Sequence, residues 1–263
     1  ETFVTVERYL KLFSEYSKIN EVSFVLSGIS SYSFSPMLSQ LNIMKEDWGI
    51  EPDYIISIFD QTDIGDELCR YKNYRLIDNS NKVIVKNFGS ELINDPYNYS
   101  FFLERNKIYF SNKSKFEKLV RISYAKIKYN VIKIKSNTKC SYDKLQSYLI
   151  NGLNNEETKY MQMIINDYIE KVFNEKKLKK LFIVTHLHKQ HFQGLYKYDI
   201  GNLIEDSLKN SHHKENIIFI NFAKTDILNL DDYEVNDIAS HLIHTSQKKY
   251  ISYILDVVNK ETN

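Results

Sequence analysis

Four short runs of consecutive apolar residues along the chain predict buried β-strands. Around them, apolar residues recur at intervals of three and four, which predicts amphipathic helices. The predicted strands are "VSFVLS" at 22–27, "YIISIF" at 54–59, "LFIVT" at 181–185 and "IIFINF" at 217–222. The predicted helices lie at 3–17, 36–44, 113–130, 156–178, 199–209 and 244–258.

Continuously apolar strands that alternate with helices indicate a parallel sheet with helices on both faces. We therefore expect a single three-layer α/β domain over residues 1–263, with a less regular insertion at about 75–150. Folds of this class bind ligands at the carboxyl ends of the strands. The segments that follow the four strands, "GISSYS", "DQTDIGDE", "HLHKQH" and "AKTD", are therefore the places where a functional site is expected.

Composition and charge argue against several classes of protein. The 35 Lys and Arg residues nearly balance the 34 Asp and Glu residues, and a net charge of +1 predicts no nucleic-acid partner. The sequence has no run of about 18 apolar residues, so no membrane span is predicted. It shows no signal-peptide pattern. The two cysteines, Cys69 and Cys140, form no motif and indicate neither a disulfide framework nor a Cys-based zinc site.

Three histidines follow the third predicted strand, in "THLHKQHFQG" at 185–194. The segment resembles the T-H-x-H-x-D-H-x-x-G motif of metallo-β-lactamase-like metallohydrolases. It matches that motif at Thr185, His186, His188, His191 and Gly194. Gln190 replaces the aspartate that binds the second metal in that family, and a neutral amide is a poor substitute for an anionic ligand. The motif also lies late in the chain, where little sequence follows to supply further ligands. We therefore expect no metal here, and a metallohydrolase is the third candidate function.

Three other segments together resemble the SGNH (GDSL-type) hydrolases, which are esterases and acyltransferases built on a flavodoxin-like sheet. They are "SGISSYSFSPMLSQL" at 27–41, "PDYIISIFDQTDIGDE" at 52–67 and "DIASHLIHTSQKKYISYIL" at 237–255. The first resembles the family's second block, in which a turn supplies an oxyanion-hole N–H, and Ser31 stands at its glycine position. The second resembles the G-x-N-D block, with Asp60, Thr62 and Asp63 at the Gly, Asn and Asp positions.

The third segment resembles the family's closing block, an acidic residue shortly before a histidine that precedes a helix. Asp237 and His241 occupy these positions, four residues apart where the family usually has three. The resemblance implies that His241 activates a serine and that Asp237 orients the imidazole, while donors near Ser31, Gln61 and Thr62 hold the oxyanion. This chemistry needs no cofactor. Taken alone, the Asp and His equally suit an ordinary i,i+4 pair, so the order of the three blocks carries the inference.

The G-D-S nucleophile block of the family is missing from the sequence. The family's nucleophile precedes a helix like the one predicted at 3–17, so we expect it just before Glu1. A rival alignment takes "GIS" at 28–30 as the nucleophile block with Ser30 attacking, but it leaves too little chain before the second block, and we favour the first.

The expected function is that of an SGNH-like serine esterase or acyltransferase whose substrate is a small-molecule or glycan ester. A non-catalytic SGNH-fold protein in glycan biosynthesis or binding is the alternative. The missing nucleophile block and the Thr62 at the Asn position favour that alternative.

Overall fold

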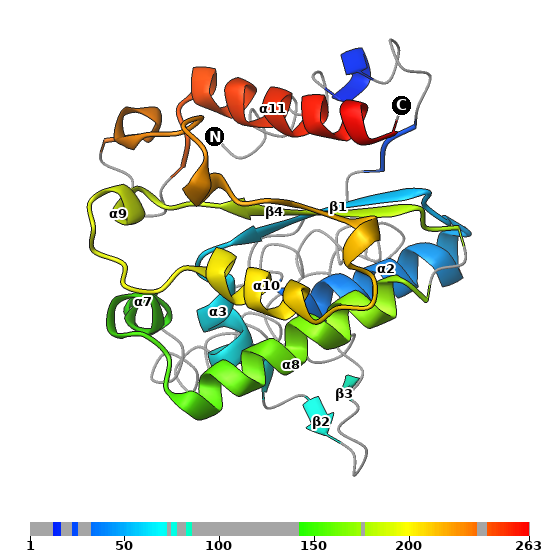
Figure 1. Cartoon of the computed structure of the whole chain (residues 1–263), viewed down its shortest axis with the longest axis horizontal. Helices are drawn as coiled ribbons and strands as arrows, with labels where there is room; N and C mark the ends of the chain where they lie inside the picture. The colour runs from blue at the N-terminus through cyan, green and yellow to red at the C-terminus, as the bar shows by residue number, and fades with distance from the viewer. Residues whose placement is uncertain are drawn as a thin grey trace, which may run out of the picture.

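A computed structural model describes residues 13–16, 23–25, 33–72, 75–77, 83–85, 142–174, 177–235 and 241–262. These residues form a mixed α/β fold around a parallel sheet of three strands (Figure 1). The strands, in the order β1-β4-β5, are β1 (Tyr54–Asp60), β4 (Lys180–His186) and β5 (Ile217–Ile220). A separate antiparallel pair consists of β2 (Arg75–Ile77) and β3 (Val83–Val85). The prediction of a parallel sheet is confirmed.

Helices lie on both faces of the sheet (Figure 1). One face is covered by α11 (His244–Thr262), and the other by α2 (Phe34–Trp48), α8 (Asn155–Val172) and α10 (Ile200–Lys209). The other helical elements of the described residues are α3 (Asp63–Gly65), a π-helix (Asp66–Tyr71), α7 (Tyr142–Asn151), α9 (Lys189–Phe192) and three 3₁₀ turns (Lys214–Asn216, Phe222–Lys224, Leu230–Asp232).

The four helices that cover the sheet confirm the predictions at 36–44, 156–178, 199–209 and 244–258, with shifted ends. Residues 13–16 of the predicted first helix are helical, and the rest of that helix and the one predicted at 113–130 lie outside the described residues. Residues 23–25 are described and belong to no strand, so the strand prediction at 22–27 is wrong for them. Within the predicted insertion, β2, β3 and α7 are regular elements.

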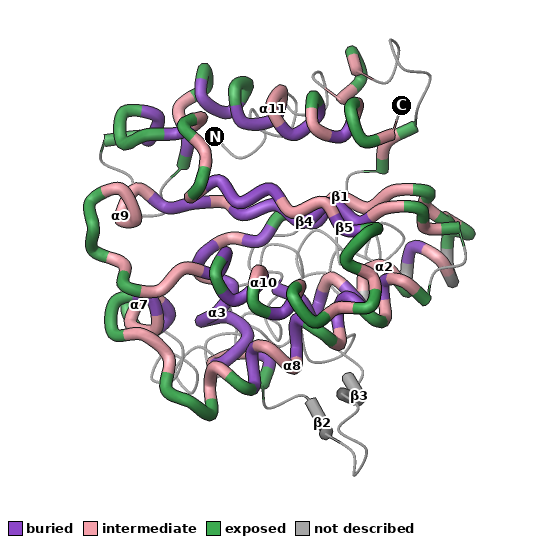
Figure 2. The backbone as a smooth tube through the Cα atoms, in the orientation of Figure 1, coloured by how far each residue is buried: buried purple, intermediate pink, exposed green. Residues whose placement is uncertain are grey.

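The strand β4 shows how the two faces of the sheet divide the core. Successive side chains of a strand point to opposite faces. Leu181 and Ile183 therefore pack with α8 and α10, whereas Phe182 and Val184 pack with α11. All four side chains are fully buried, and Figure 2 shows burial along this strand. A strand covered on both faces must be apolar at every position, which explains the unbroken run "LFIV".

Parallel pairing places the carboxyl ends of the strands at one edge of the sheet. Asp60 at the end of β1 lies opposite His186 at the end of β4. The hydroxyl of Thr185 accepts the backbone N–H of Phe222 at 3.0 Å and so links the end of β4 to the turn after β5. Turns from different parts of the sequence therefore meet at this edge.

Close contact between α3 and α7 depends on Gly65. A Cβ at this position would lie 2.8 Å from both the Cα and the carbonyl oxygen of Leu145, closer than real Cβ atoms approach backbone. We expect Gly65→Ala to lower the free energy of unfolding by about 2 kcal/mol, because the two helices must separate to admit the methyl group. Urea unfolding followed by circular dichroism measures the loss. An unchanged midpoint would show that the contact is not tight.

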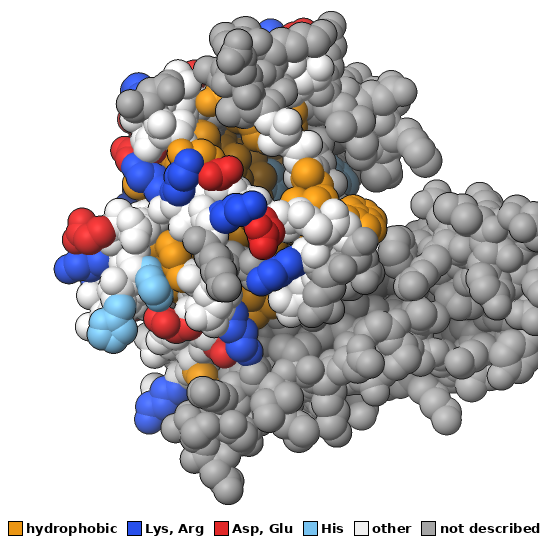
Figure 3. All heavy atoms as spheres, turned by 90° about the vertical axis from the view of Figure 1, so that its right-hand side faces the viewer, with side chains coloured by type: hydrophobic (Ala, Val, Ile, Leu, Met, Phe, Trp, Pro, Cys, Tyr) orange, Lys and Arg blue, Asp and Glu red, His pale blue; other side chains and the backbone are white. Residues whose placement is uncertain are grey.

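The face at the amino ends of β1 and β4 carries charges of both signs (Figure 3). Its ion pairs are Lys177–Glu51 at 2.7 Å, Lys179–Asp53 at 3.0 Å and Lys180–Glu261 at 2.8 Å. Exposed pairs of this kind contribute little stability.

Among the described helices, none is both long and apolar enough to cross a membrane. Cys69 is disulfide-bonded, which the cysteine spacing did not predict.

Candidate functional site

The turn that follows β1 folds back on the carboxylate of Asp60. The backbone N–H and the hydroxyl of Thr62 donate to Asp60 Oδ1 at 2.8 and 2.6 Å. The Asp63 carboxylate accepts the backbone N–H of Asp60 at 2.8 Å. Asp and Thr favour such local side-chain-to-backbone contacts in turns. The contacts fix the Asp60 carboxylate at the carboxyl end of the strand.

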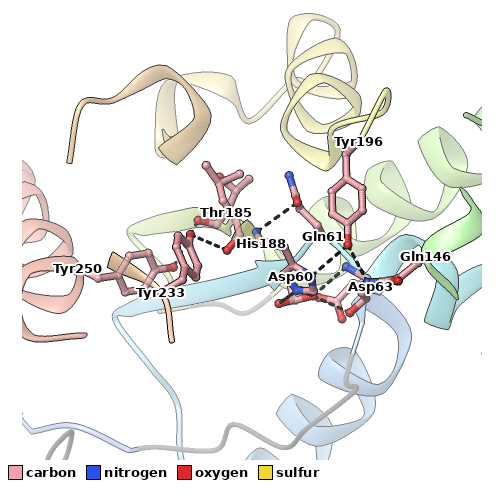
Figure 4. A network of polar contacts seen from close by, with 11 residues as sticks. Asp60, Gln61, Asp63, Gln146, Thr185, His188, Tyr196, Tyr233 and Tyr250 are labelled. Carbon is pink, nitrogen blue, oxygen red and sulfur yellow. Dashed lines mark hydrogen bonds and ion pairs between the residues drawn. The ribbon is translucent and has the colours of Figure 1, made fainter. Parts of the chain in front are cut away.

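His188, two residues beyond β4, binds this carboxylate. Its Nε2 lies 2.8 Å from both Asp60 Oδ1 and Oδ2. The His188 side chain is 3% exposed, whereas that of Asp60 is 33% exposed. The backbone N–H of His188 also donates to Gln61 Oε1 at 3.2 Å, so the turn after β1 is fastened to the segment after β4 (Figure 4).

The second ring nitrogen of His188 faces Tyr196. The distance from Nδ1 to the Tyr196 hydroxyl is 3.4 Å, and Gln146 Nε2 donates to the same hydroxyl at 3.1 Å. A carboxylate can only accept, so a ring that carries one hydrogen holds it on Nε2, and Nδ1 then accepts from the phenol. When the ring carries this single hydrogen, the donors run in one direction, from Gln146 through Tyr196 and His188 to Asp60, along the contacts drawn in Figure 4.

The neighbours of Asp60 hold it in the ionised form. Burial alone would raise the pKa of its carboxyl. The charge interaction with His188, the hydrogen bond from His188, the charge of His186 and the hydrogen bond from Thr62 together outweigh burial and lower that pKa below its ordinary range. Asp60 is therefore an anion at neutral pH and an acceptor for the imidazole.

Asp63 has the opposite tendency although it lies in the same turn. Burial, followed by the negative charges of Asp60, Asp66 and Glu67, raises the pKa of the Asp63 carboxyl well above its ordinary value. The hydrogen bond from the Asp60 backbone N–H lowers this pKa but does not compensate. Two neighbouring carboxyl groups are thus driven toward different protonation states, an arrangement common in acid–base sites.

We expect the variant Asp63→Asn to change how stability depends on pH. An acid whose pKa is raised on folding contributes stability below its unfolded pKa of about 4 and loses it as the pH rises through the folded value. The amide stays neutral and keeps an oxygen to accept the Asp60 N–H. The variant should therefore gain stability relative to the natural chain as the pH is raised from 4.5 to 8. Urea unfolding across this range measures the difference, and parallel curves would contradict the expectation.

Two of the expected oxyanion residues lie in the turn after β1. Gln61 is fully buried, accepts the backbone N–H of His188, and has its Nε2 3.4 Å from His191 Nδ1. Both donors of Thr62 are engaged by Asp60. Three other expected site residues, Ser30, Ser31 and Asp237, lie outside the described residues.

His241, the expected base, is exposed and lies just before α11. Its carbonyl oxygen accepts the N–H of Glu234 at 3.0 Å, next to a bridge that pairs Tyr233 with Leu242. The Tyr233 hydroxyl donates to the carbonyl of Leu187, the residue that follows β4, at 2.8 Å. The structure therefore places the segment that contains His241 at the same edge of the sheet as the turn after β1.

A buried carboxylate joins two of the segments that resemble SGNH blocks. Glu67, in the second segment, accepts hydrogen bonds from the hydroxyls of Ser33 and Ser35 in the first, the latter at 2.7 Å. All three side chains are buried. These contacts hold the start of α2 against the π-helix that follows β1.

The three histidines at the end of β4 and just beyond it have different partners. His188 binds Asp60, His191 lies near Gln61, and the ring of His186 meets that of Tyr250 edge-on at a centroid distance of 5.5 Å. Among the residues that the structure describes, no group of three or more His, Cys, Asp or Glu side chains is placed to hold a metal ion.

Sequence reasoning missed the binding of His188 to Asp60 and the roles of Tyr196 and Gln146. The signal for His188 was present, since it follows a predicted strand in a polar segment. Nothing in the local sequence marks Tyr196 or Gln146.

The fold and the site define a mixed α/β protein with a connected polar network at the carboxyl edge of a parallel sheet. No protein-family model, curated protein or solved structure matches the chain. The site is therefore interpreted from its own geometry.

Proposed function

We propose that the protein is an SGNH-like serine esterase or acyltransferase that acts on an ester such as an acylated carbohydrate. The proposal includes the flavodoxin-like three-layer architecture of that family. The observation that supports it is the placement of the SGNH-like segments, of which two are in contact and the third lies at the carboxyl edge of the sheet. Glu67 joins the first two through Ser33 and Ser35, and the segment with His241 lies at the same sheet edge.

In the proposed reaction a serine attacks the ester carbonyl and His241 accepts its proton. His241 then returns the proton to the leaving alcohol, and water or an acceptor hydroxyl takes the acyl group. An exposed imidazole suits this role because it must reach the bound substrate. Asp237 would orient the imidazole, and donors near Ser31, Gln61 and Thr62 would hold the oxyanion.

A non-catalytic SGNH-fold protein in glycan biosynthesis or binding is the second candidate. The observation in its favour is that both Thr62 donors are used by Asp60, while the Gln61 side chain bridges His188 and His191. Donors that are already engaged are poorly placed to hold a developing oxyanion, which needs them free and aimed at the substrate.

The test is release of p-nitrophenolate from p-nitrophenyl acetate and butyrate by the protein expressed from its complete reading frame. We expect release well above that of a heat-denatured sample, together with covalent labelling of one serine by a fluorophosphonate. Absence of both would reject the esterase and support the second candidate. That candidate predicts tighter binding of acylated than of deacylated glycan by calorimetry.

A further inference from the structure

Three hydrogen-bonded residues, Tyr196, His188 and Asp60, form a line in the same order as the nucleophile, histidine and carboxylate of a catalytic triad. The Tyr196 hydroxyl lies 3.4 Å from His188 Nδ1, and His188 Nε2 lies 2.8 Å from both oxygens of the Asp60 carboxylate. In a triad, one imidazole nitrogen takes the proton of the nucleophile while a carboxylate holds the other nitrogen. The SGNH-like reaction proposed above gives His188 no role.

The base of this line is held rigidly. His188 is almost fully buried, and two donors from Thr62 fix the Asp60 carboxylate that it binds. Asp60 ends one strand of the sheet and His188 follows the adjacent strand, so the imidazole is oriented by the sheet itself. Tyr196, in contrast, is partly exposed on the loop between α9 and α10, where an external molecule can approach it.

Two neighbours of the Tyr196 hydroxyl suit a nucleophilic role for it. Nδ1 of His188 faces it as a base, and Gln146 Nε2 donates to the same oxygen at 3.1 Å, which would stabilise a phenolate. A separation of 3.4 Å is long for a hydrogen bond, but catalytic hydrogen bonds are often long before substrate binds. Figure 4 shows the phenol directed into this network between Gln146 and His188.

We propose that Tyr196 is a second nucleophile of this protein, which accepts an acyl group from an ester with His188 as the base and Asp60 as its carboxylate partner. The bond from Tyr196 Oη to the acyl carbon forms as the bond from that carbon to the leaving oxygen breaks. The phenol proton passes to His188 Nδ1 and then to the leaving oxygen. The aryl ester so formed is itself an acyl donor to water or a hydroxyl. The inference rests on the proposed function for its substrate class.

The test is acetylation by p-nitrophenyl acetate, located by mass spectrometry of peptides. We expect Tyr196 to be acetylated roughly tenfold or more faster than Tyr253, a partly exposed tyrosine of α11 that serves as an internal control. Asp60→Asn should remove this advantage, because the amide keeps the size of the side chain but lacks its charge. His188→Gln should do the same, and Tyr196→Phe should abolish the adduct at that peptide.

Two results would overturn the inference, namely equal acetylation of Tyr196 and Tyr253, or an advantage that survives in Asp60→Asn. The result also separates this inference from the proposed function. Ester turnover without an adduct on Tyr196 rejects the second nucleophile and leaves the SGNH-like reaction standing. An adduct on Tyr196 in a protein without ester turnover supports the reactive tyrosine and rejects that reaction.

Discussion

Replacing His188 with alanine is expected to lower the free energy of unfolding by about 3 kcal/mol. The ring is buried, so its removal leaves a cavity and ends the contacts with Asp60 and Tyr196. The carboxylate of Asp60 then keeps its charge without its partner. Because this carboxylate is 33% exposed, water stabilises its unpaired charge in part. The expected loss of unfolding free energy therefore lies at the lower end of the range for breaking a buried ion pair. Urea unfolding at pH 7 measures the change.

The matched control is His191→Ala. His191 is only partly buried and contacts Gln61 at 3.4 Å, so its loss should cost less than about 1 kcal/mol. A further check is the pH dependence of the His188→Ala effect. An acid whose pKa is lowered on folding contributes stability above its unfolded pKa of about 4 and loses it as the pH falls through the folded value. The effect should therefore shrink in acid, and equal losses in the two alanine variants at pH 7 would contradict the assignment of the pair.

The elements that the sequence predicted well are those whose pattern is local. The apolar run "LFIV" indicates a strand that is buried on both faces, whichever elements cover it. The helices α10 and α11 carry apolar stripes at helical spacing. The helix α7 was missed because its stability depends on contacts far along the chain. Gly65 packs against Leu145, and the backbone N–H groups of Lys197 and Tyr198 donate to the carbonyl of Leu149.

The site was predictable only in part, for a similar reason. Parallel strands bring the segments after β1 and β4 to one edge, so the location followed from the fold class. The choice of Asp60 as the partner of His188 depends on the register in which β1 pairs with β4, and no local pattern specifies register between distant strands. From the sequence we expected no metal at the three histidines, and a histidine–carboxylate pair was not predicted.

Within the proposed esterase, His241→Ala is expected to lower the hydrolysis of p-nitrophenyl acetate by roughly hundreds- to thousands-fold, because the serine would lose its proton acceptor. The fold should persist, since His241 is exposed and contributes its backbone carbonyl to the contact with Glu234. Circular dichroism and the urea midpoint of the variant verify this. The rate measurement then reports the loss of chemistry alone.

His244→Ala is the matched control for this prediction. His244 is also exposed, lies at the first position of α11 and is three residues from His241, so both variants remove an imidazole from the same region of the surface. We expect near-natural turnover in His244→Ala because the resemblance to the SGNH closing block places the proposed base at the histidine that precedes the helix. Full turnover in His241→Ala with loss in His244→Ala would show that the base is the other histidine. If both variants keep full turnover, neither histidine is the base of the reaction. Tyr196 and His188 then become the candidates for it, and the variants of these two residues test whether they catalyse the hydrolysis.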